Sequence, residues 1–206
     1  MARYFDVHPR NPQSRTVAQI AEVLRSDGLV AYPTDSGYAL GARLGSTSAL
    51  TRIKRIRHLD DKHHFTLICK DFAQLGAFVY LDNAEFRAIK AATPGPYTFI
   101  LRATPEVPRR MAHPRKKTVG ARIPDSPVVQ AILAEMGEPI LSSSLILPDV
   151  EEPLTDGWAV KEALDDHVDG VVDAGEITAD PTTVVDYSSG EPVVVRVGAG
   201  DPTRFE

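Results

Sequence analysis

Residues 29–41 have the sequence LVAYPTDSGYALG, in which two short apolar segments flank the polar residues 34–37. The pattern predicts a strand that ends at a turn, because Pro33 lacks a backbone donor and Gly37 permits unusual dihedral angles. This stretch would bring three hydroxyl groups and a carboxylate into one small volume, from Thr34, Ser36, Tyr38 and Asp35. Two interpretations fit: a loop that binds a small polar ligand, or a hairpin whose hydroxyls cap their own backbone.

The overall composition is that of a globular protein. The chain has 206 residues, 43% of them hydrophobic, which is sufficient for a packed core. No apolar run approaches the roughly 20 residues needed to cross a bilayer, and residues 1–6 lack the apolar core of a signal peptide. We therefore expect a cytoplasmic protein. The single cysteine, Cys69, follows apolar residues and is predicted to be a buried strand residue.

The charges are unevenly distributed along the chain. Residues 1–122 contain 20 Lys and Arg against 10 Asp and Glu, whereas residues 123–206 contain 3 against 18. The first part therefore carries about +10 and the second about −15, although the net charge is only −5. Either the first part faces an anionic partner, which is the interpretation that local clustering favours, or the two parts attract each other.

Hydrophobic periodicity predicts an alternation of helices and strands without a strict βαβ order. Helices are expected at residues 14–27, 47–57, 83–93, 126–136 and 156–164, and strands at residues 65–69, 97–102, 118–123, 139–144, 168–173, 182–187 and 192–197. This mixture favours a single α/β domain over residues 1–206, with an open, twisted mixed sheet and helices packed on it. The alternative is a separate sub-lobe formed by the acidic last third.

A first cationic cluster lies at residues 52–64. Arg55 and Arg57 point in different directions on a helix, so they can meet at one ligand only if the helix ends near them. Guanidinium groups suit phosphate or carboxylate oxygens, although a solvated helix face is the ordinary explanation of such a cluster. Its members are Arg52, Lys54, Arg55, Arg57, His58, Lys62, His63 and His64.

A second cationic cluster lies on the connection between two predicted strands and consists of Arg109, Arg110, Arg115, Lys116 and Lys117. Such a connection either contacts a phosphate backbone, with salt-dependent affinity, or is a mobile, solvated excursion. Few aromatic residues accompany either cluster, so nucleic-acid contacts would be made to phosphates rather than to stacked bases.

Several common sites are not predicted. His63 and His64 are adjacent and point in different directions, and no His or Cys set has metal-site spacing, so we expect no protein-bound metal. A P-loop, a dinucleotide glycine fingerprint and a nucleophile elbow are also missing from the sequence.

Six segments together resemble the YrdC/YciO family in order and spacing, over nearly the whole chain. They are residues 32–41, the basic segment up to Arg57, residues 94–101, 120–124, 181–186 and 195–198. The sequence of residues 36–39, SGYA, and of residues 65–67, FTL, is similar to the YciO branch in particular.

The resemblance implies a YrdC-like fold with a positively charged concave face suited to double-stranded RNA and nucleotides. Active relatives make threonylcarbamoyl-adenylate from L-threonine, bicarbonate and ATP for tRNA modification. ATP would be a substrate that brings its own Mg²⁺. The alternative implied by the family is a non-catalytic protein that binds double-stranded RNA or nucleotides.

The resemblance also implies site residues. Arg55 and Arg57 take the catalytic Lys-x-Arg positions, and Thr34, Tyr38 and Arg122 take the threonine site. The nucleotide would contact Arg55, Arg57, Ser142, Ser144, Thr183 and Arg196. The RNA contacts are expected from the two cationic clusters instead, at Lys54, Arg109, Arg110, Arg115, Lys116 and Lys117. Two positions depart from the family pattern: Arg55 stands where the family has lysine, and Ser144 where it has asparagine.

Overall fold

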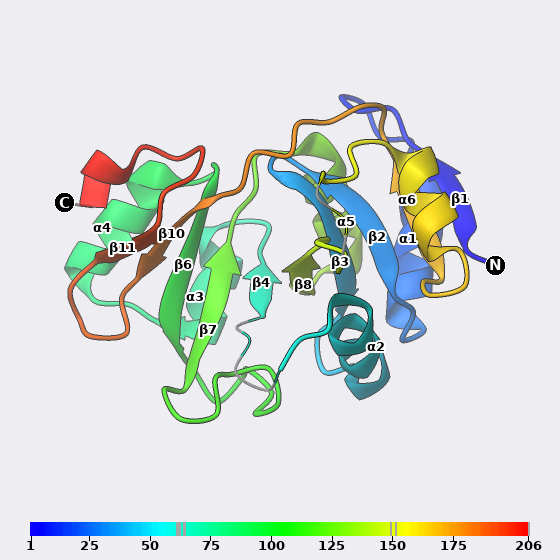
Figure 1. Cartoon of the computed structure of the whole chain (residues 1–206). Coiled ribbons are helices and arrows are strands. Elements are labelled where there is room, and N and C mark those ends of the chain that lie inside the picture. Colours follow the sequence, from blue (N-terminus) through cyan, green and yellow to red (C-terminus); the bar gives the residue numbers. More distant parts are fainter. Residues whose placement is uncertain (61–62, 64, 149, 151, 206) are drawn as a thin grey trace.

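The computed structural model describes residues 1–60, 63, 65–148, 150 and 152–205. These residues form one sheet with helices on both of its faces (Figure 1). The helices are α1 (Ser14–Arg25), α2 (Thr47–Arg57), α3 (Phe72–Phe78), α4 (Asn83–Ala92), α5 (Pro127–Met136), α6 (Gly157–Leu164) and the 3-10 helix η1 (Pro202–Phe205). The strands are β1 (Arg3–Asp6), β2 (Val30–Thr34), β3 (Gly37–Arg43), β4 (Thr66–Ile68), β5 (Val79–Tyr80), β6 (Tyr97–Ala103), β7 (Thr118–Arg122), β8 (Ile140–Ser144), β9 (Gly170–Asp173), β10 (Thr183–Asp186) and β11 (Val193–Arg196).

The sheet is mixed, as the sequence predicts. Its strand order is β1-β9-β2-β3-β8-β4-β7-β6-β10-β11, and β5 pairs with β6 beside this path. Strand β9 lies parallel to β1 and β2, and β10 lies parallel to β6. The described part of the acidic last third therefore contributes strands towards both ends of the same sheet.

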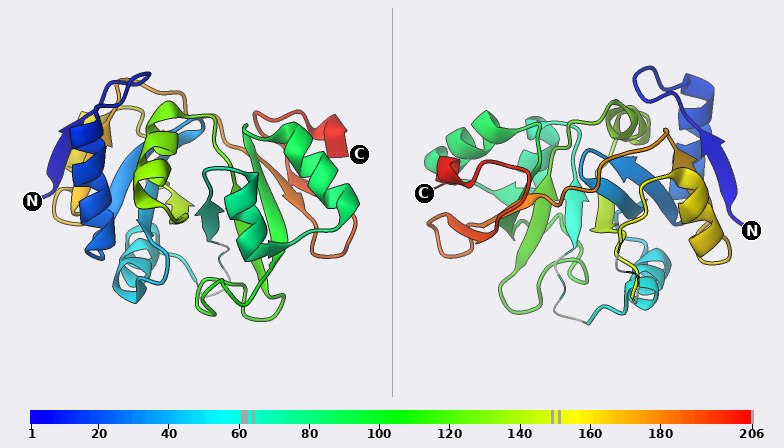
Figure 2. Two further views of the ribbon diagram at one scale, coloured as in Figure 1. Left: turned by 180° about the vertical axis from the view of Figure 1, so that it is seen from behind. Right: turned by 45° about the horizontal axis from the view of Figure 1, so that its top comes forward.

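The helices divide between the two faces of the sheet. Helices α1, α5, α3 and α4 cover the face seen in the left view of Figure 2, whereas α2 and α6 lie on the opposite side (Figures 1 and 2). One apolar cluster joins α1 and α5 to β2 and includes Ile20, Leu24, Val129 and Leu133. In the described residues no helix is long and apolar enough to span a bilayer.

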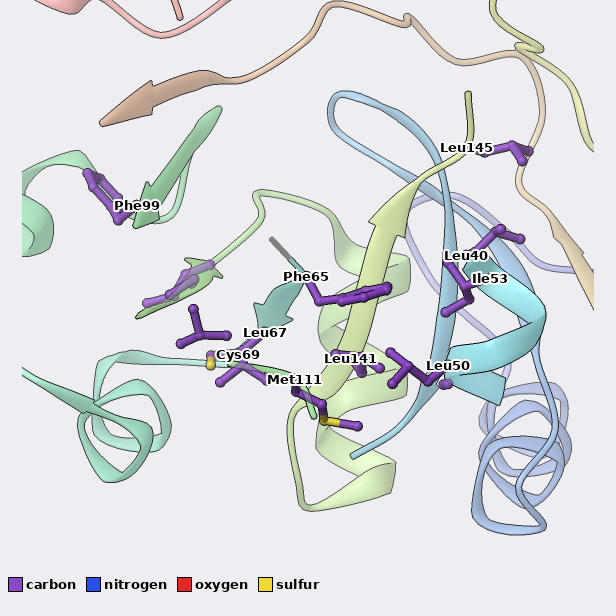
Figure 3. Close-up of a cluster of buried hydrophobic side chains, with 14 of the residues drawn as sticks. Leu40, Leu50, Ile53, Phe65, Leu67, Cys69, Phe99, Met111, Leu141 and Leu145 are labelled. Carbon is purple, nitrogen blue, oxygen red and sulfur yellow. The ribbon is translucent and has the colours of Figure 1, made fainter. Parts of the chain in front are cut away.

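The larger apolar cluster lies around the middle of the sheet (Figure 3). Phe65, Leu40, Ile53 and Leu141 are almost fully buried in it. Helix α2 begins after a Ser46 cap and packs Leu50 and Ile53 against this cluster. This packing holds the helix in place, and with it Arg57, its last residue.

Most predicted elements are confirmed, with ends that differ by one or two residues. The prediction missed α3 because it has only seven residues, contains Gly76 and buries only Leu75. It also missed β1, whose pairing partner β9 lies more than 160 residues away. Cys69 is buried as predicted, and burial raises the pKa of its thiol to about 12, so the nucleophilic thiolate is disfavoured.

Candidate functional site

The polar stretch at residues 34–37 is the turn of a hairpin between β2 and β3. Thr34 pairs with Gly37, and Gly37 adopts a φ of 109°, which favours glycine. The Thr34 hydroxyl donates to the Gly37 carbonyl at 2.7 Å and accepts from the Ser36 amide at 3.1 Å. The turn therefore uses the Thr34 hydroxyl to cap its own backbone, which is one of the two interpretations that the sequence allows.

Arg122, the last residue of β7, joins the hairpin turn to the middle of the sheet. Its guanidinium forms an ion pair with Asp35 and donates to the Ser36 hydroxyl at 2.6 Å. Burial lowers the pKa of Arg122, and the Asp35 carboxylate opposes this effect. Nε of Arg122 is buried without a hydrogen-bond partner among the described residues. The ion pair fixes the turn against β7.

Two tyrosines of the hairpin are buried and bonded. The Tyr32 and Ser142 hydroxyls are 2.7 Å apart, and the Tyr38 hydroxyl donates to the Val172 carbonyl at 3.0 Å. Burial raises the pKa of both tyrosines, that of Tyr32 to about 12. Residue 41 must be small, because a Cβ there would lie 2.5 Å from the Tyr32 ring.

A cavity of about 310 Å³ lies beside the turn and is lined by residues of β2, β3, β4, β6, β7, β8 and β11. Its lining is rich in hydroxyl groups: eight of the lining residues are serine or threonine. The lining residues are Thr34, Ser36, Gly37, Tyr38, Ala39, Thr66, Ile68, Thr98, Arg122, Ser142, Ser143, Ser144, Leu145, Ile146, Pro153, Leu154, Ala179, Pro181, Thr182 and Arg196.

Two arginines line the cavity, and one of them, Arg122, is paired with Asp35. The described lining includes Arg122 and Arg196 and contains no Asp or Glu. Arg196 donates hydrogen bonds from its Nε and Nη2 to the Thr182 carbonyl, at 3.0 and 2.8 Å. The Thr182 hydroxyl lies 2.8 Å from that of Thr98. A small anionic ligand with several hydrogen-bonding oxygens suits this lining.

Arg57 lies behind the cavity wall at the end of α2. It donates to the Ser143 hydroxyl at 2.5 Å and lies 3.5 Å from Nε2 of His63. Burial lowers the pKa of Arg57. Arg57 therefore reaches the cavity through Ser143, which lines it.

The structure brings together only some of the predicted site residues. Thr34, Tyr38, Arg122, Ser142, Ser144 and Arg196 all line the cavity. Arg55 is exposed on α2 and is not among the described lining residues. Thr183 is fully buried and bonds the turn at Gly198 and Gly200, whereas its neighbour Thr182 faces the cavity. The functional roles assigned to these residues stay predictions.

Sequence reasoning missed three threonines of the lining, Thr66, Thr98 and Thr182. Each lies within or next to a predicted strand, where threonine is common, so its type alone carries no signal. Thr66 faces Gly120 of β7, where a Cβ would lie 2.7 Å from the Thr66 hydroxyl oxygen. Pairing between distant strands brings these residues together.

The second cationic cluster is exposed but anchored. Arg109, Arg110, Arg115, Lys116 and Lys117 are all exposed, while Val107 and Met111 of the same connection are buried in the core. The connection precedes β7, whereas Arg122 ends it, so the cluster and the hairpin turn lie at opposite ends of that strand. The cluster is thus an ordered surface separate from the turn.

Some of the cations in the first part of the chain form ion pairs with carboxylates of the second part. Arg52 pairs with Asp169 at 2.6 Å and Lys116 with Asp186 at 3.7 Å, in each case between the basic and the acidic part of the chain. Mutual attraction therefore explains some of the asymmetry. Among the described residues, no group of three His, Cys, Asp or Glu side chains is placed to hold a metal ion.

Comparisons with known proteins agree with this geometry. A family model for Sua5, YciO and YrdC, described as telomere recombination, matches residues 22–198. Escherichia coli YciO is 46% identical over 205 residues, and its crystal structure has a TM-score of 0.96 with full coverage of both chains.

Proteins with a described activity or ligand are more distant and longer. Threonylcarbamoyl-AMP synthase of Bacillus subtilis is 29% identical over 92% of this chain and 55% of its own length. The structure of Pyrococcus abyssi Sua5 complexed with L-threonine is 25% identical, has a TM-score of 0.85, and is matched over 95% of this chain and 57% of that chain. On the family model and the full-length similarity to YciO, the chain belongs to the Sua5/YciO/YrdC family.

Proposed function

We propose that the chain binds ATP and L-threonine in the cavity and makes threonylcarbamoyl-adenylate from L-threonine, bicarbonate and ATP, for tRNA modification. The observation that carries this proposal is the lining itself: many hydroxyls, two arginines and no acidic residue among the described lining residues. The described activity of the Bacillus subtilis relative and the threonine bound to Sua5 support the same assignment.

The reaction needs positioning and charge stabilisation more than covalent chemistry. Threonine and bicarbonate form a carbamate with loss of water, and a carbamate oxygen then attacks the α-phosphorus of ATP. The new P–O bond replaces the bond to pyrophosphate, which leaves with its electron pair. Arg196 on the wall and Arg57 behind Ser143 would stabilise the phosphate charge, and Mg²⁺ would arrive bound to ATP.

The turnover should be slow. Arg55 and Ser144 replace the lysine and asparagine of active relatives, and Arg55 is exposed away from the lining. A lost polar contact beside developing charge costs on the order of a hundredfold in rate. We therefore expect Ser144→Asn, which restores the amide of active relatives at a lining residue, to be at least about tenfold faster than the natural chain.

The test is incubation of the full chain with ATP, bicarbonate and labelled threonine, followed by chromatography for the adenylate and pyrophosphate. We expect threonine-dependent pyrophosphate release that Arg196→Ala reduces and Arg87→Ala leaves unchanged, because Arg87 is exposed on α4, outside the lining. Pyrophosphate release that is absent, or that does not require threonine, would falsify the enzymatic proposal.

A second candidate function is RNA binding without catalysis. It is favoured by the exposed cations Arg109, Arg110, Arg115, Lys116 and Lys117, whose connection is anchored by buried residues, and Lys54 would extend this surface. In this proposal the cluster and a positively charged concave face contact the phosphates of double-stranded RNA.

Titration with a double-stranded RNA at several salt concentrations tests this candidate. The affinity should fall steeply with salt, and replacing Arg109, Arg110, Lys116 and Lys117 by alanine should weaken it and flatten the salt dependence. A control variant removes the same charge elsewhere, at Arg10, Arg15, Arg87 and Lys90, all of them exposed. Equal loss in the two variants would show that only net charge matters.

A further inference from the structure

Three side chains from separate elements meet behind the cavity wall. Arg57 comes from the end of α2, His63 from the segment before β4, and Ser143 from β8. Nη1 of Arg57 is 2.5 Å from the Ser143 hydroxyl oxygen and 3.5 Å from Nε2 of His63, and this hydroxyl oxygen is 3.3 Å from Nε2. The three polar groups thus form a closed triangle of hydrogen-bonding distances.

The triangle is held in place by its surroundings. The His63 ring meets the ring of Phe65 edge to face, with 5.3 Å between centroids, and Phe65 is buried in the core. Nε of Arg57 faces the Ile146 carbonyl at 3.5 Å. Ser143 is only 4% exposed, and it is also one of the residues that line the cavity.

The protonation of Nε2 decides what Ser143 can offer to a ligand. A hydroxyl has one hydrogen and two lone pairs, and the Arg57 guanidinium only donates. If Nε2 carries no proton, it accepts from Ser143, whose remaining lone pair faces the cavity. If Nε2 carries a proton, Ser143 accepts from both Arg57 and His63, and its only hydrogen is left to point into the cavity.

We propose that Arg57, His63 and Ser143 form a donor switch, in which a proton on Nε2 of His63 makes Ser143 a hydrogen-bond donor to an anionic oxygen in the cavity. His63 is then a positioning residue that acts through Ser143. An anion selects the form with the protonated Nε2, whereas a ligand that donates a hydrogen bond selects the other form. The inference deepens the proposed function, on which it rests, by assigning an anion-specific contact to Ser143.

Inorganic pyrophosphate, added to the full chain without threonine or bicarbonate, is a suitable probe. The imidazole ¹⁵N signals, assigned by comparison with His63→Gln, report the state of Nε2 at constant pH. We expect pyrophosphate to move the Nε2 signal of His63 towards that of a protonated ring nitrogen. Calorimetry on the same samples gives the affinity.

Variants at position 143 separate the switch from general charge attraction. Ser143→Ala should weaken pyrophosphate binding by about tenfold or more and abolish the change at Nε2, because the charge-assisted hydrogen bond is lost. Ser143→Thr keeps the hydroxyl and should restore both. The control Ser189→Ala removes a hydroxyl on the exposed surface and should change neither. Melting temperatures show whether each variant is folded.

The inference is overturned if pyrophosphate binds without changing the Nε2 signal, if Ser143→Ala binds as tightly as the natural chain, or if the natural chain binds no pyrophosphate. None of these readouts requires turnover. A responsive His63 together with absent adenylate formation would therefore contradict the enzymatic proposal alone. Adenylate formation with an unresponsive His63 would contradict only the switch.

Discussion

Arg122 at the cavity wall and the cations of the connection between β6 and β7 are held in opposite ways. Arg122 at the cavity is buried and bonded to Asp35 and Ser36 of a turn far from it in the sequence. The five cations of the connection are exposed, and Lys116 has one loose ion pair with Asp186 at 3.7 Å.

Burial and partners distinguish the charges that stabilise the fold from those that do not. A buried charge that loses its partner is strongly destabilising, whereas an exposed ion pair contributes little because water and salt screen it. The cavity arginine is therefore inseparable from the stability of the hairpin turn. Replacing the cations of the connection should change the free energy of unfolding little. Their charges would become important only for binding an anion.

The largest effect is expected from removing the buried cation. Arg122→Ala leaves the Asp35 carboxylate, whose side chain is only 16% exposed, without its guanidinium. The free energy of unfolding should fall by about 3 to 5 kcal/mol, measured by urea denaturation. Arg110→Ala in the connection serves as the control. If the two variants were equally stable, the contrast between the two regions would be wrong.

A comparable loss is expected where the connection is anchored. Met111 is 3% exposed and packs in the central cluster, so Met111→Ala leaves a cavity and should cost about 3 kcal/mol. The same denaturation experiment measures it. A cost below about 0.5 kcal/mol, as is usual at the surface, would mean that the connection is not held by the core.

Alkaline pH should destabilise the cavity side through Tyr32. Burial raises its pKa from 10.0 to about 12, so the stability it contributes is complete below pH 10 and is lost as the pH rises towards 12. In Tyr32→Phe this loss should be smaller by about 3 kcal/mol, because phenylalanine does not ionise. The exposed Tyr80, changed to phenylalanine, is the control. An unchanged alkaline slope in Tyr32→Phe would contradict the prediction.

The smallest effect is expected from the exposed cations. Lys116→Ala breaks the pair with Asp186, in which the lysine side chain is 54% exposed. The free energy of unfolding should change by less than about 0.5 kcal/mol, and the change should vanish in high salt. A decrease in the free energy of unfolding of more than about 2 kcal/mol would mean that the Lys116 charge stabilises the fold as the buried Arg122 does.

Local signals in the sequence were sufficient for most elements. The helix at residues 47–57 is confirmed at both ends because a serine cap, an apolar repeat and basic residues in its last turn agree with one another. The strand and turn predicted within residues 29–41 are confirmed for the same reason, since Pro33, the polar turn and Gly37 lie together. Where a short element depends on distant partners, as in β1, local signals fail.

The site was predictable only in part. The cationic and hydroxyl residues were visible in the sequence, and the order of motifs indicated the family. Arg57, at the end of helix α2, reaches the cavity through Ser143. At the start of β10 the facing residue was assigned wrongly, because Thr182, rather than Thr183, lines the cavity. A shift of one residue along a strand reverses the side to which a side chain points.

The mixed α/β class, the polar turn and the cationic residues follow from the sequence alone, because propensity, turn chemistry and charge are local properties. Only the tertiary structure decided that Arg122 binds the turn that contains Asp35, that His63 meets Arg57 and Ser143, and that the connection stands apart from the turn. These contacts join residues far apart in the chain, and strand order and burial, which no local pattern encodes, select them.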